Sequence, residues 1–475
     1  MNKYKKLAFN TMIFAIGTFG SKILVLLLTR LYTAHISPAN NYTRELLETM
    51  ALFLWPIFTF ALTEAVIRYG LDKKYNKKEV FSTASILTLC GLGLMALVVP
   101  LLVHIPFLRD IGGYTVLLIV YVCTSSIRSL CMQFVRARGF VKLFSLDGIL
   151  ATLTLFIFNI TFIAKLHWGV GGYMLSVILS DFCSSVFLII TARLDKFFSP
   201  RYYSKKLASS MMRFSTPMIP AIVMWTITSL SDRIFISNMN SSHVFLGKDA
   251  AGLYGVANKV PNLISMVSTI FFQAWNMSAI MENDSRDRSK FYEKVYGAYE
   301  SLLFIASAGL ILFVRPISAI FVNSRNFAEY KTAYLYTPVL IIAVLFTCLD
   351  QFLGSIYTAT KHTKNSFWTS FVACVVNLVL NASLIPEWGV QGAAIATFLS
   401  YYICFWARII DARYYVPFGF SAVKSLANTA MLFVMCWCII SRPAGYVVWL
   451  LLMFGIICYL NYQAIIDTVK KIIKR

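Results

Sequence analysis

The sequence predicts an all-α polytopic membrane protein with fourteen transmembrane helices. Three observations lead to this fold class. Of the 475 residues, 58% are hydrophobic and only 13% are charged, against roughly 25% charged residues in ordinary soluble domains. Apolar runs fill the chain without a polar linker, although a soluble core would split into domains beyond ~250–300 residues. The Lys and Arg residues lie mainly between the apolar runs, as membrane orientation requires.

Each transmembrane helix needs roughly 20 apolar residues, and fourteen segments satisfy this requirement. The first follows a basic start, is longer than a signal-peptide core and precedes no cleavage site, so we expect it to be retained. The connections between segments are short. The predicted spans are residues 8–33, 46–68, 81–103, 113–135, 144–165, 171–192, 214–238, 251–279, 296–321, 332–359, 366–385, 391–412, 422–440 and 445–466.

The distribution of basic residues orients these spans. Alternate connections, counted from a cytoplasmic N-terminus, hold 30 Lys and Arg residues, and the opposite set holds 7. A missed or false span would scramble this alternation. We therefore expect both termini in the cytoplasm, with the protein in the cytoplasmic (inner) membrane of a cell. The net charge of +22 follows from this placement and does not indicate a nucleic-acid partner.

Cysteine and histidine patterns give no sign of a disulfide framework, a metal site or a cofactor. All ten cysteines fall within apolar segments and none forms a CxxC pair, so we interpret them as small apolar packing residues. None of the five histidines pairs with another at ligand spacing. No Walker motif is present, so we do not expect ATP hydrolysis by this chain.

One stretch of the sequence recurs. Trp168-Gly-Val-Gly-Gly-Tyr-Met returns as Trp388-Gly-Val-Gln-Gly-Ala-Ala, 220 residues later. This offset equals six predicted spans, and the alternative is that a Gly-rich turn arose twice by chance. The repeat predicts parallel bundles, which in transporters enclose the substrate site near the midplane. The predicted parts are a six-helix bundle at 1–192, a basic cytoplasmic linker at 193–213, a second six-helix bundle at 214–412, and two appended helices with a basic tail at 413–475.

Several charges fall inside the predicted spans. A charge at the centre of a membrane helix costs about 2.5–3.5 kcal/mol on translocon scales, so such residues usually face a watery cavity or a partner. Arg128 and Asp350 lie 222 residues apart, so equivalent places in the two halves carry opposite charges. The basic residues are Lys22, Arg30, Arg128, Arg233, Lys259 and Arg315, and the acidic ones are Glu64, Asp181, Asp232 and Asp350.

The basic residues predict a cavity that attracts an anion, in particular a phosphate, whose charge several cations can share. The structural alternative is pairing of these cations with Asp181, Asp232 or Asp350. Arg315 lies near a predicted surface, where a long side chain can snorkel. The residues predicted to line the cationic cavity are Lys22, Arg30, Arg128, Arg233 and Lys259.

The seventh and eighth predicted spans carry three short motifs in order: Arg213-Phe-Ser-Thr-Pro-Met-Ile-Pro220, Ser231-Asp-Arg-Ile-Phe-Ile236 and Ala251-Gly-Leu-Tyr-Gly-Val-Ala-Asn-Lys259. Together with the Trp-Gly-Val-x-Gly turns and the topology, they resemble the polysaccharide flippases of the multidrug/oligosaccharidyl-lipid/polysaccharide (MOP) exporter superfamily. The resemblance covers the whole chain. The individual motifs are moderately specific, and their order is more so.

The resemblance implies a flippase, without enzymatic activity, that moves undecaprenyl-diphosphate-linked oligosaccharide units to the outer leaflet by alternating access for cell-surface polysaccharide biosynthesis. It places the diphosphate and sugars in a cationic lumen that includes Lys22, Arg30, Arg233 and Lys259. It leaves open whether H⁺ or Na⁺ drives the step. Asp181 and Asp350, with Asp232 adjacent to Arg233, are the candidates for such coupling or for charge pairing.

Three alternatives remain open. A multidrug antiporter of the same superfamily would favour an acidic, aromatic-lined pocket for organic cations, and a lipid II flippase would need a similar cationic cavity. A membrane-embedded polysaccharide polymerase or glycosyltransferase would normally carry a sizeable outer loop, and none is predicted. The basic linker is expected to lie on anionic lipid headgroups, or alternatively to dock a glycosyltransferase or polymerase of the same pathway.

Overall fold

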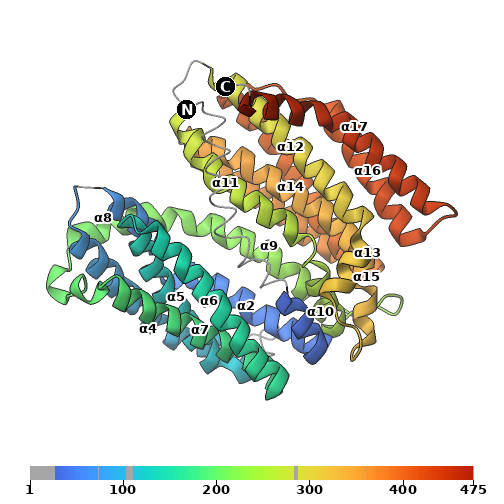
Figure 1. The fold of residues 1–475 in the computed structure, drawn as a ribbon. Coiled ribbons are helices and arrows are strands. Elements are labelled where there is room, and N and C mark those ends of the chain that lie inside the picture. The colour runs from blue at the N-terminus through green and yellow to red at the C-terminus, as the bar shows by residue number, and fades with distance from the viewer. Residues whose placement is uncertain (1–26, 73, 103–110, 283–286, 361, 474–475) are drawn as a thin grey trace. The chain divides into compact units, whose positions relative to one another are not determined.

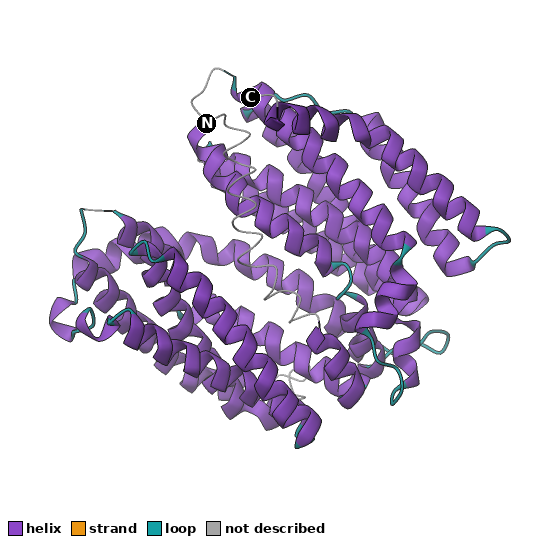
Figure 2. Cartoon of the chain, in the orientation of Figure 1, coloured by secondary structure: helices purple, strands orange, loops and turns teal. Residues whose placement is uncertain are grey.

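The computed structural model describes residues 27–72, 74–102, 111–282, 287–360 and 362–473, and over these residues the chain contains helices, turns and loops but no strands (Figure 1, Figure 2). Nine helices in the described ranges are long and apolar enough to cross a membrane, and a bent pair adds a tenth. The predicted all-α, multi-pass membrane protein is confirmed. The count of fourteen spans and the cytoplasmic position of the termini stay predictions.

The described residues form two compact units, here called the N-terminal unit (27–234) and the C-terminal unit (235–473). The division falls inside one helix, α9, rather than in a loop. The predicted linker 193–213 lies wholly in the N-terminal unit. That unit contains a helical segment at 27–35, then α2 (Pro38–Phe58), α3 (Leu62–Leu71), α4 (Lys77–Leu102), α5 (Thr115–Ala137), α6 (Val141–Asn159), η2 (Ile160–Lys165), α7 (Gly169–Thr191), η3 (Leu194–Lys196), η4 (Pro200–Tyr202), α8 (Lys205–Ser215), η5 (Thr216–Met218) and most of α9 (Ile219–Asn238).

The second predicted span, 46–68, starts too late and misses a break within it. Helix α2 starts eight residues earlier, at Pro38, because the Ser37 hydroxyl caps the helix and proline suits its first turn. The helix breaks after Phe58, where Phe60 and Ala61 take left-handed backbone angles, and α3 continues at a bend of 54°. The early start places Arg44, which precedes the predicted span 46–68, inside a helix.

The basic linker packs against the N-terminal unit through polar and apolar contacts. Tyr69 Oη donates to Ser210 O (3.1 Å), Ser82 Oγ donates to Phe197 O (2.9 Å), and Ser204 N donates to Thr83 Oγ1 (3.1 Å). A buried apolar cluster joins the linker to α3, α4, α5 and α7; its members include Leu62, Phe81, Phe134, Leu188, Leu194 and Met211. The linker is therefore an integral part of this unit's packing.

The C-terminal unit contains the end of α9, α10 (Lys248–Ala257), α11 (Asn262–Glu282), α12 (Arg288–Leu312), α13 (Val314–Phe321), η6 (Ala328–Thr332), α14 (Ala333–Ala359), α15 (Thr363–Tyr415), α16 (Ala422–Ser441) and α17 (Tyr446–Ile473). Two predicted continuous spans are wrong. The span 251–279 is interrupted between α10 and α11 next to Pro261, which lacks a backbone N–H. The span 296–321 is divided at Phe313 into α12 and α13.

Both copies of the sequence repeat form tight turns. Gly169 (φ 53°) and Gly389 (φ 57°) have left-handed backbone angles, which glycine adopts without a Cβ penalty. Within α15, the side chain of Arg408 reaches Thr369 (Nε to Oγ1, 3.0 Å). A straight helix would separate these residues by roughly 58 Å at 1.5 Å per residue, so α15 folds back on itself at Gly389. The same arrangement joins α6 and α7 through Gly169.

Candidate functional site

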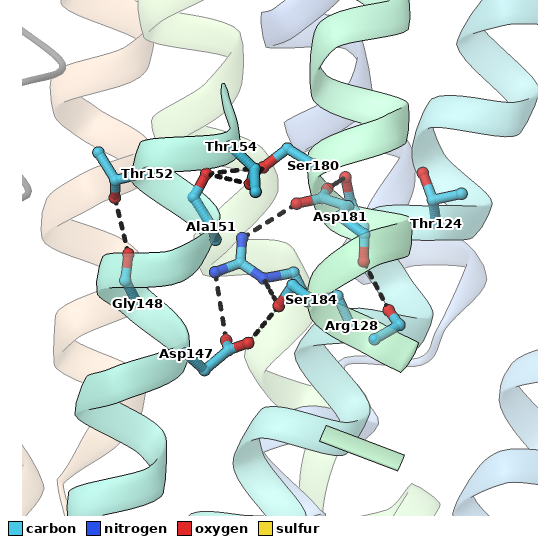
Figure 3. Close-up of polar contacts among 12 residues, drawn as sticks. Thr124, Arg128, Asp147, Gly148, Ala151, Thr152, Thr154, Ser180, Asp181 and Ser184 are labelled. Carbon is cyan, nitrogen blue, oxygen red and sulfur yellow. Dashed lines mark hydrogen bonds and ion pairs between the residues drawn. The ribbon is translucent and has the colours of Figure 1, made fainter. Parts of the chain in front are cut away.

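A buried ionic network connects α5, α6 and α7 in the N-terminal unit (Figure 3). Arg128 on α5 directs all three nitrogen positions of its guanidinium at polar partners. Its Nη1 lies 3.0 Å from Asp181 Oδ1 on α7, and its Nη2 lies 3.4 Å from Asp147 Oδ2 on α6. Its Nε donates to Ser184 Oγ at 2.8 Å. One guanidinium therefore holds three helices together.

Serine hydroxyls complete the network. Ser125 donates to Asp181, and Ser184 donates to Asp147. Asp147 is fully buried, Asp181 is 6% exposed, and the Arg128 side chain is 24% exposed. Because burying unpaired charge is costly, these hydrogen bonds account for how two carboxylates and one guanidinium coexist inside the bundle. The network carries a formal charge of −1.

A second ionic cluster surrounds Arg44 on α2. The guanidinium carbon lies 4.5 Å from the ring centre of Tyr32 and 4.9 Å from that of Tyr173. Its nitrogens lie 2.9 Å from Glu45 Oε1 and 3.2 Å from Glu48 Oε2. Only 2% of this arginine side chain is exposed. Cation–π contacts and two carboxylates thus replace the water that a buried guanidinium loses.

Arg233 on α9 extends the second cluster. Its Nη2 lies 3.4 Å from Glu45 Oε2, and its Nη1 donates to Thr49 Oγ1 at 2.7 Å. Among the described residues, its buried Nε finds no acceptor. The Asp-Arg motif of the seventh predicted span therefore directs its arginine onto α2, while one donor of the guanidinium remains without a partner there.

A cavity of about 390 Å³ adjoins both clusters. Charged groups from three helices line it: Glu48 from α2, Arg128 from α5 and Asp181 from α7. The aromatic residues in its wall are Trp55, Tyr121 and Tyr173. Two carboxylates against one guanidinium, with aromatic rings beside them, favour a cationic or uncharged polar occupant over an anion.

The cations predicted to share one lumen occupy different environments. Lys22 lies outside the described residues. Arg30 is exposed on the 27–35 segment, and Lys259 is partly buried in the turn between α10 and α11 of the C-terminal unit. Arg128 and Arg233 are both ion-paired inside the N-terminal unit. Arg128 therefore follows the structural alternative, in which the cations pair with acidic residues. One of its two partners, Asp147, is not among the acidic residues predicted from the sequence.

The acidic candidates also separate. Asp181 belongs to the Arg128 network, and Asp232 is buried on α9 beside Arg233. Asp350 is fully buried on α14 of the C-terminal unit. There, Arg408 from the second half of α15 donates to the Asp350 backbone oxygen at 2.8 Å. Arg128 lies on α5 of the N-terminal unit, whereas Arg408 lies on the second half of α15, the last helix of the second predicted bundle. The opposite charges of Arg128 and Asp350 are therefore accompanied by a second pair of opposite charges, Asp181 and Arg408, on the last helix of each bundle.

Three of the paired carboxylates are not among the charges predicted from the sequence. Asp147 lies inside a predicted span, and Glu45 and Glu48 lie around the start of another, yet none was singled out. The Ser37-Pro38 pair is the signal that could have found the last two, since it marks a helix start eight residues before the predicted one. In the described residues, no group of three or more His, Cys, Asp and Glu side chains is arranged to hold a metal ion.

Comparisons with known proteins establish the fold. No protein-family model matches the sequence, and no curated protein matches it. Solved structures match at low sequence identity. A lipid II flippase, MurJ, in an inward closed conformation aligns with a TM-score of 0.67 and 16% identity over 96% of this chain and 100% of that chain.

Two MATE transporters match as well. An inward-facing MATE family transporter of the MOP superfamily aligns with a TM-score of 0.65 and 13% identity over 87% of this chain and 99% of that chain. A mutant of the Vibrio cholerae MATE transporter VcmN gives a TM-score of 0.63 and 12% identity over 87% and 98%. The chain therefore has the fold of MOP superfamily transporters.

Proposed function

We propose that this chain is a flippase of the cytoplasmic membrane that moves undecaprenyl-diphosphate-linked oligosaccharides from the inner to the outer leaflet by alternating access. The observation that carries the proposal is the nearly end-to-end match to a lipid flippase. That structure covers 96% of the chain, and the two MATE transporters each cover 87%. The motifs that resemble those of polysaccharide flippases favour an oligosaccharide linked to undecaprenyl diphosphate as the substrate.

In this proposal, Lys22, Arg30, Arg233 and Lys259 bind the diphosphate. Arg233 has the best structural support, because its Nε lacks an acceptor among the described residues and a phosphate oxygen is a strong acceptor for a guanidinium. Arg128 receives a different role. Its three nitrogen positions are already directed at protein oxygens, so it balances the charge of the N-terminal unit instead of binding substrate.

The test is leaflet exchange of a labelled undecaprenyl-diphosphate oligosaccharide in proteoliposomes that contain the purified protein. We expect exchange by the wild type and its loss in Lys22→Ala and in Arg233→Ala. The matched control is Arg325→Ala, which removes an exposed arginine of a predicted outer connection. No exchange by the wild type would refute the function, and normal exchange by both variants would refute the assigned site.

A specific observation favours a second function. The cavity in the N-terminal unit combines Glu48 and Asp181 with Trp55, Tyr121 and Tyr173, the acidic and aromatic lining expected for an organic-cation antiporter. If the wild type carries a fluorescent organic cation against a proton or sodium gradient, and Glu48→Gln abolishes this transport, the antiporter replaces the flippase as the function of the chain.

A further inference from the structure

A buried carboxyl group in the C-terminal unit lacks the partners that its counterparts have. Asp350 lies near the middle of α14 and is fully buried. Among the residues that the structure describes, no donor reaches either of its carboxylate oxygens. Arg408 donates to its backbone oxygen instead, at 2.8 Å, and the nearby Cys404 thiol donates to Thr369 O at 3.6 Å.

A second buried carboxyl group lies on the adjacent helix α12. Glu300 is 5% exposed, and its Oε1 has no hydrogen-bond partner within the described ranges. The hydroxyl of Tyr296, one helical turn earlier, is also buried and lies near the Glu300 carboxyl group. Tyr296 lies within electrostatic range of both Glu300 and Asp350. The helices α12, α14 and α16 pack against one another, so these groups form one cluster inside the unit.

Other charged and titratable groups lie near Asp350 and Glu300 on the surrounding helices. Arg408 and Cys404 approach Asp350 from α15, and Cys348 approaches it along α14. Lys424 on α16 lies near Glu300, and its Nζ donates to Ser301 Oγ at 3.1 Å. Tyr299 adds a second phenol from α12. The cluster thus contains two carboxyl groups and two basic side chains, Arg408 and Lys424.

This environment favours proton binding. An ionised carboxylate that is buried without hydrogen bonds loses several kcal/mol of solvation, and protonation removes that cost by making the group neutral. A metal cation would need several oxygen ligands in place around it. A proton needs only one carboxylate oxygen. The unpartnered oxygens of Asp350 and Glu300 therefore suit a proton better than Na⁺.

The N-terminal unit provides the contrast. Asp147 and Asp181 both accept bonds from Arg128 and from a serine hydroxyl. These contacts stabilise the ionised form of each carboxylate. Of the acids considered for ion coupling, Asp181 therefore has a hydrogen-bond donor for each carboxylate oxygen, and Asp350 has a hydrogen-bond partner for neither among the described residues.

We propose that Asp350, with Glu300 and Tyr296, forms a proton-binding site buried in the C-terminal unit, and that this site takes up and releases one proton in each transport cycle. The step converts the carboxylate and a proton from water into a carboxylic acid, and release reverses it without electron transfer. Proton binding stands on the geometry of the cluster alone. Its link to transport rests on the proposed function.

The first experiment measures proton binding without any substrate. The carbonyl stretch of a protonated carboxyl group is followed by infrared difference spectroscopy on purified, lipid-reconstituted protein while the pH is lowered. We expect a band that grows in the wild type, disappears in Asp350→Asn and persists in the matched variant Asp181→Asn of the N-terminal unit. A band that is unchanged in Asp350→Asn, or that is absent from the wild type, would overturn the proposal.

A second variant guards against a folding defect. If Asp350→Asn loses its thermal unfolding transition, Glu300→Gln is titrated instead. Removing the neighbouring carboxylate should let Asp350 ionise more easily, so the midpoint of the band should move to lower pH. A midpoint identical to that of the wild type would overturn the assignment of Glu300 to the proton-binding site.

The second experiment links the site to transport. Leaflet exchange of the labelled lipid-linked oligosaccharide is measured in proteoliposomes with and without an imposed pH gradient. We expect the gradient to stimulate exchange by the wild type, and we expect this stimulation to be lost in Asp350→Asn. If the wild type moves no such lipid, the proposed function fails, and the infrared titration still decides the proton site. Stimulation by a sodium gradient alone would assign coupling to Na⁺ and overturn the inference.

Discussion

Arg128 Nη1 lies 3.0 Å from Asp181 Oδ1, across the packed helices α5 and α7. The two residues are 53 positions apart in the sequence, and the same guanidinium also contacts Asp147 on α6. Arg128 was predicted to line an anion-binding lumen. In the structure it forms the central ion pairs of the N-terminal unit.

Removal of Arg128 should destabilise the protein strongly. Arg128→Ala leaves Asp147 and Asp181 buried without a counter-charge, and the loss of one partner of a buried pair costs about 3–5 kcal/mol. Arg128→Lys should fall between the wild type and alanine, because an ammonium group keeps the charge but does not reproduce the planar fork of donors. Thermal unfolding in detergent measures this order. Equal stability of Arg128→Ala and the wild type would show that the network carries no net stabilisation.

The stability that the Arg44 cluster contributes should depend on the shape of the guanidinium group as well as on its charge. Arg44→Lys keeps a cation between Tyr32 and Tyr173 but cannot also reach both Glu45 and Glu48 with separate guanidinium nitrogens. We expect a lower unfolding temperature for Arg44→Lys and a larger drop for Arg44→Ala. The control is Arg325→Ala, since an exposed arginine should contribute less than about 1 kcal/mol.

The two repeat turns should tolerate alanine unequally. Gly169 and Gly389 both have left-handed angles, where a Cβ costs roughly 1–2 kcal/mol. A Cβ on Gly169 would meet open space, but one on Gly389 would lie 3.3 Å from Val244 Cβ. We therefore expect Gly389→Ala to be the more destabilising of the two.

Gly171→Ala is the matched control for these turns, because its Cβ meets nothing within 4 Å and the residue is helical. Alanine there should be neutral or should stabilise the helix by about 0.5–1 kcal/mol. A loss of stability in Gly171→Ala as large as in the turn variants would remove the backbone angle as the explanation.

The two C-terminal helices should be coupled by one amide pair. Asn461 Nδ2 on α17 donates to Asn428 Oδ1 on α16 at 3.0 Å, and Asn428 Nδ2 reaches Asn461 Oδ1 at 3.4 Å. A double-mutant cycle with Asn428→Ala and Asn461→Ala should give a coupling energy near 0.6 kcal/mol and below about 1.7 kcal/mol, as for other membrane-helix hydrogen bonds. Strict additivity of the two substitutions would contradict the pairing.

The sequence predicted single charged residues better than it predicted their partners. Arg128, Asp181 and Asp350 stand out because charges are rare in apolar runs. Arg44 did not stand out, because it precedes the apolar run of the predicted span 46–68. A hydropathy window also cannot detect that two tyrosine rings and two carboxylates surround its charge. Arg408 lies inside the predicted span 391–412 and was not among the charges predicted to matter, although it is 3% exposed and contacts the backbone of Asp350.

The amino-acid sequence by itself determined the all-helical, multi-pass membrane class and the repeated Trp-Gly turns. Both depend on local properties: the apolar content of a window of about 20 residues and the backbone freedom of glycine at one position. Only the tertiary structure decided which charges are neutralised and which are not. Arg128 meets Asp147 and Asp181, and Asp350 meets no donor among the described residues, because the packing of helices distant in sequence sets the partners of each buried charge.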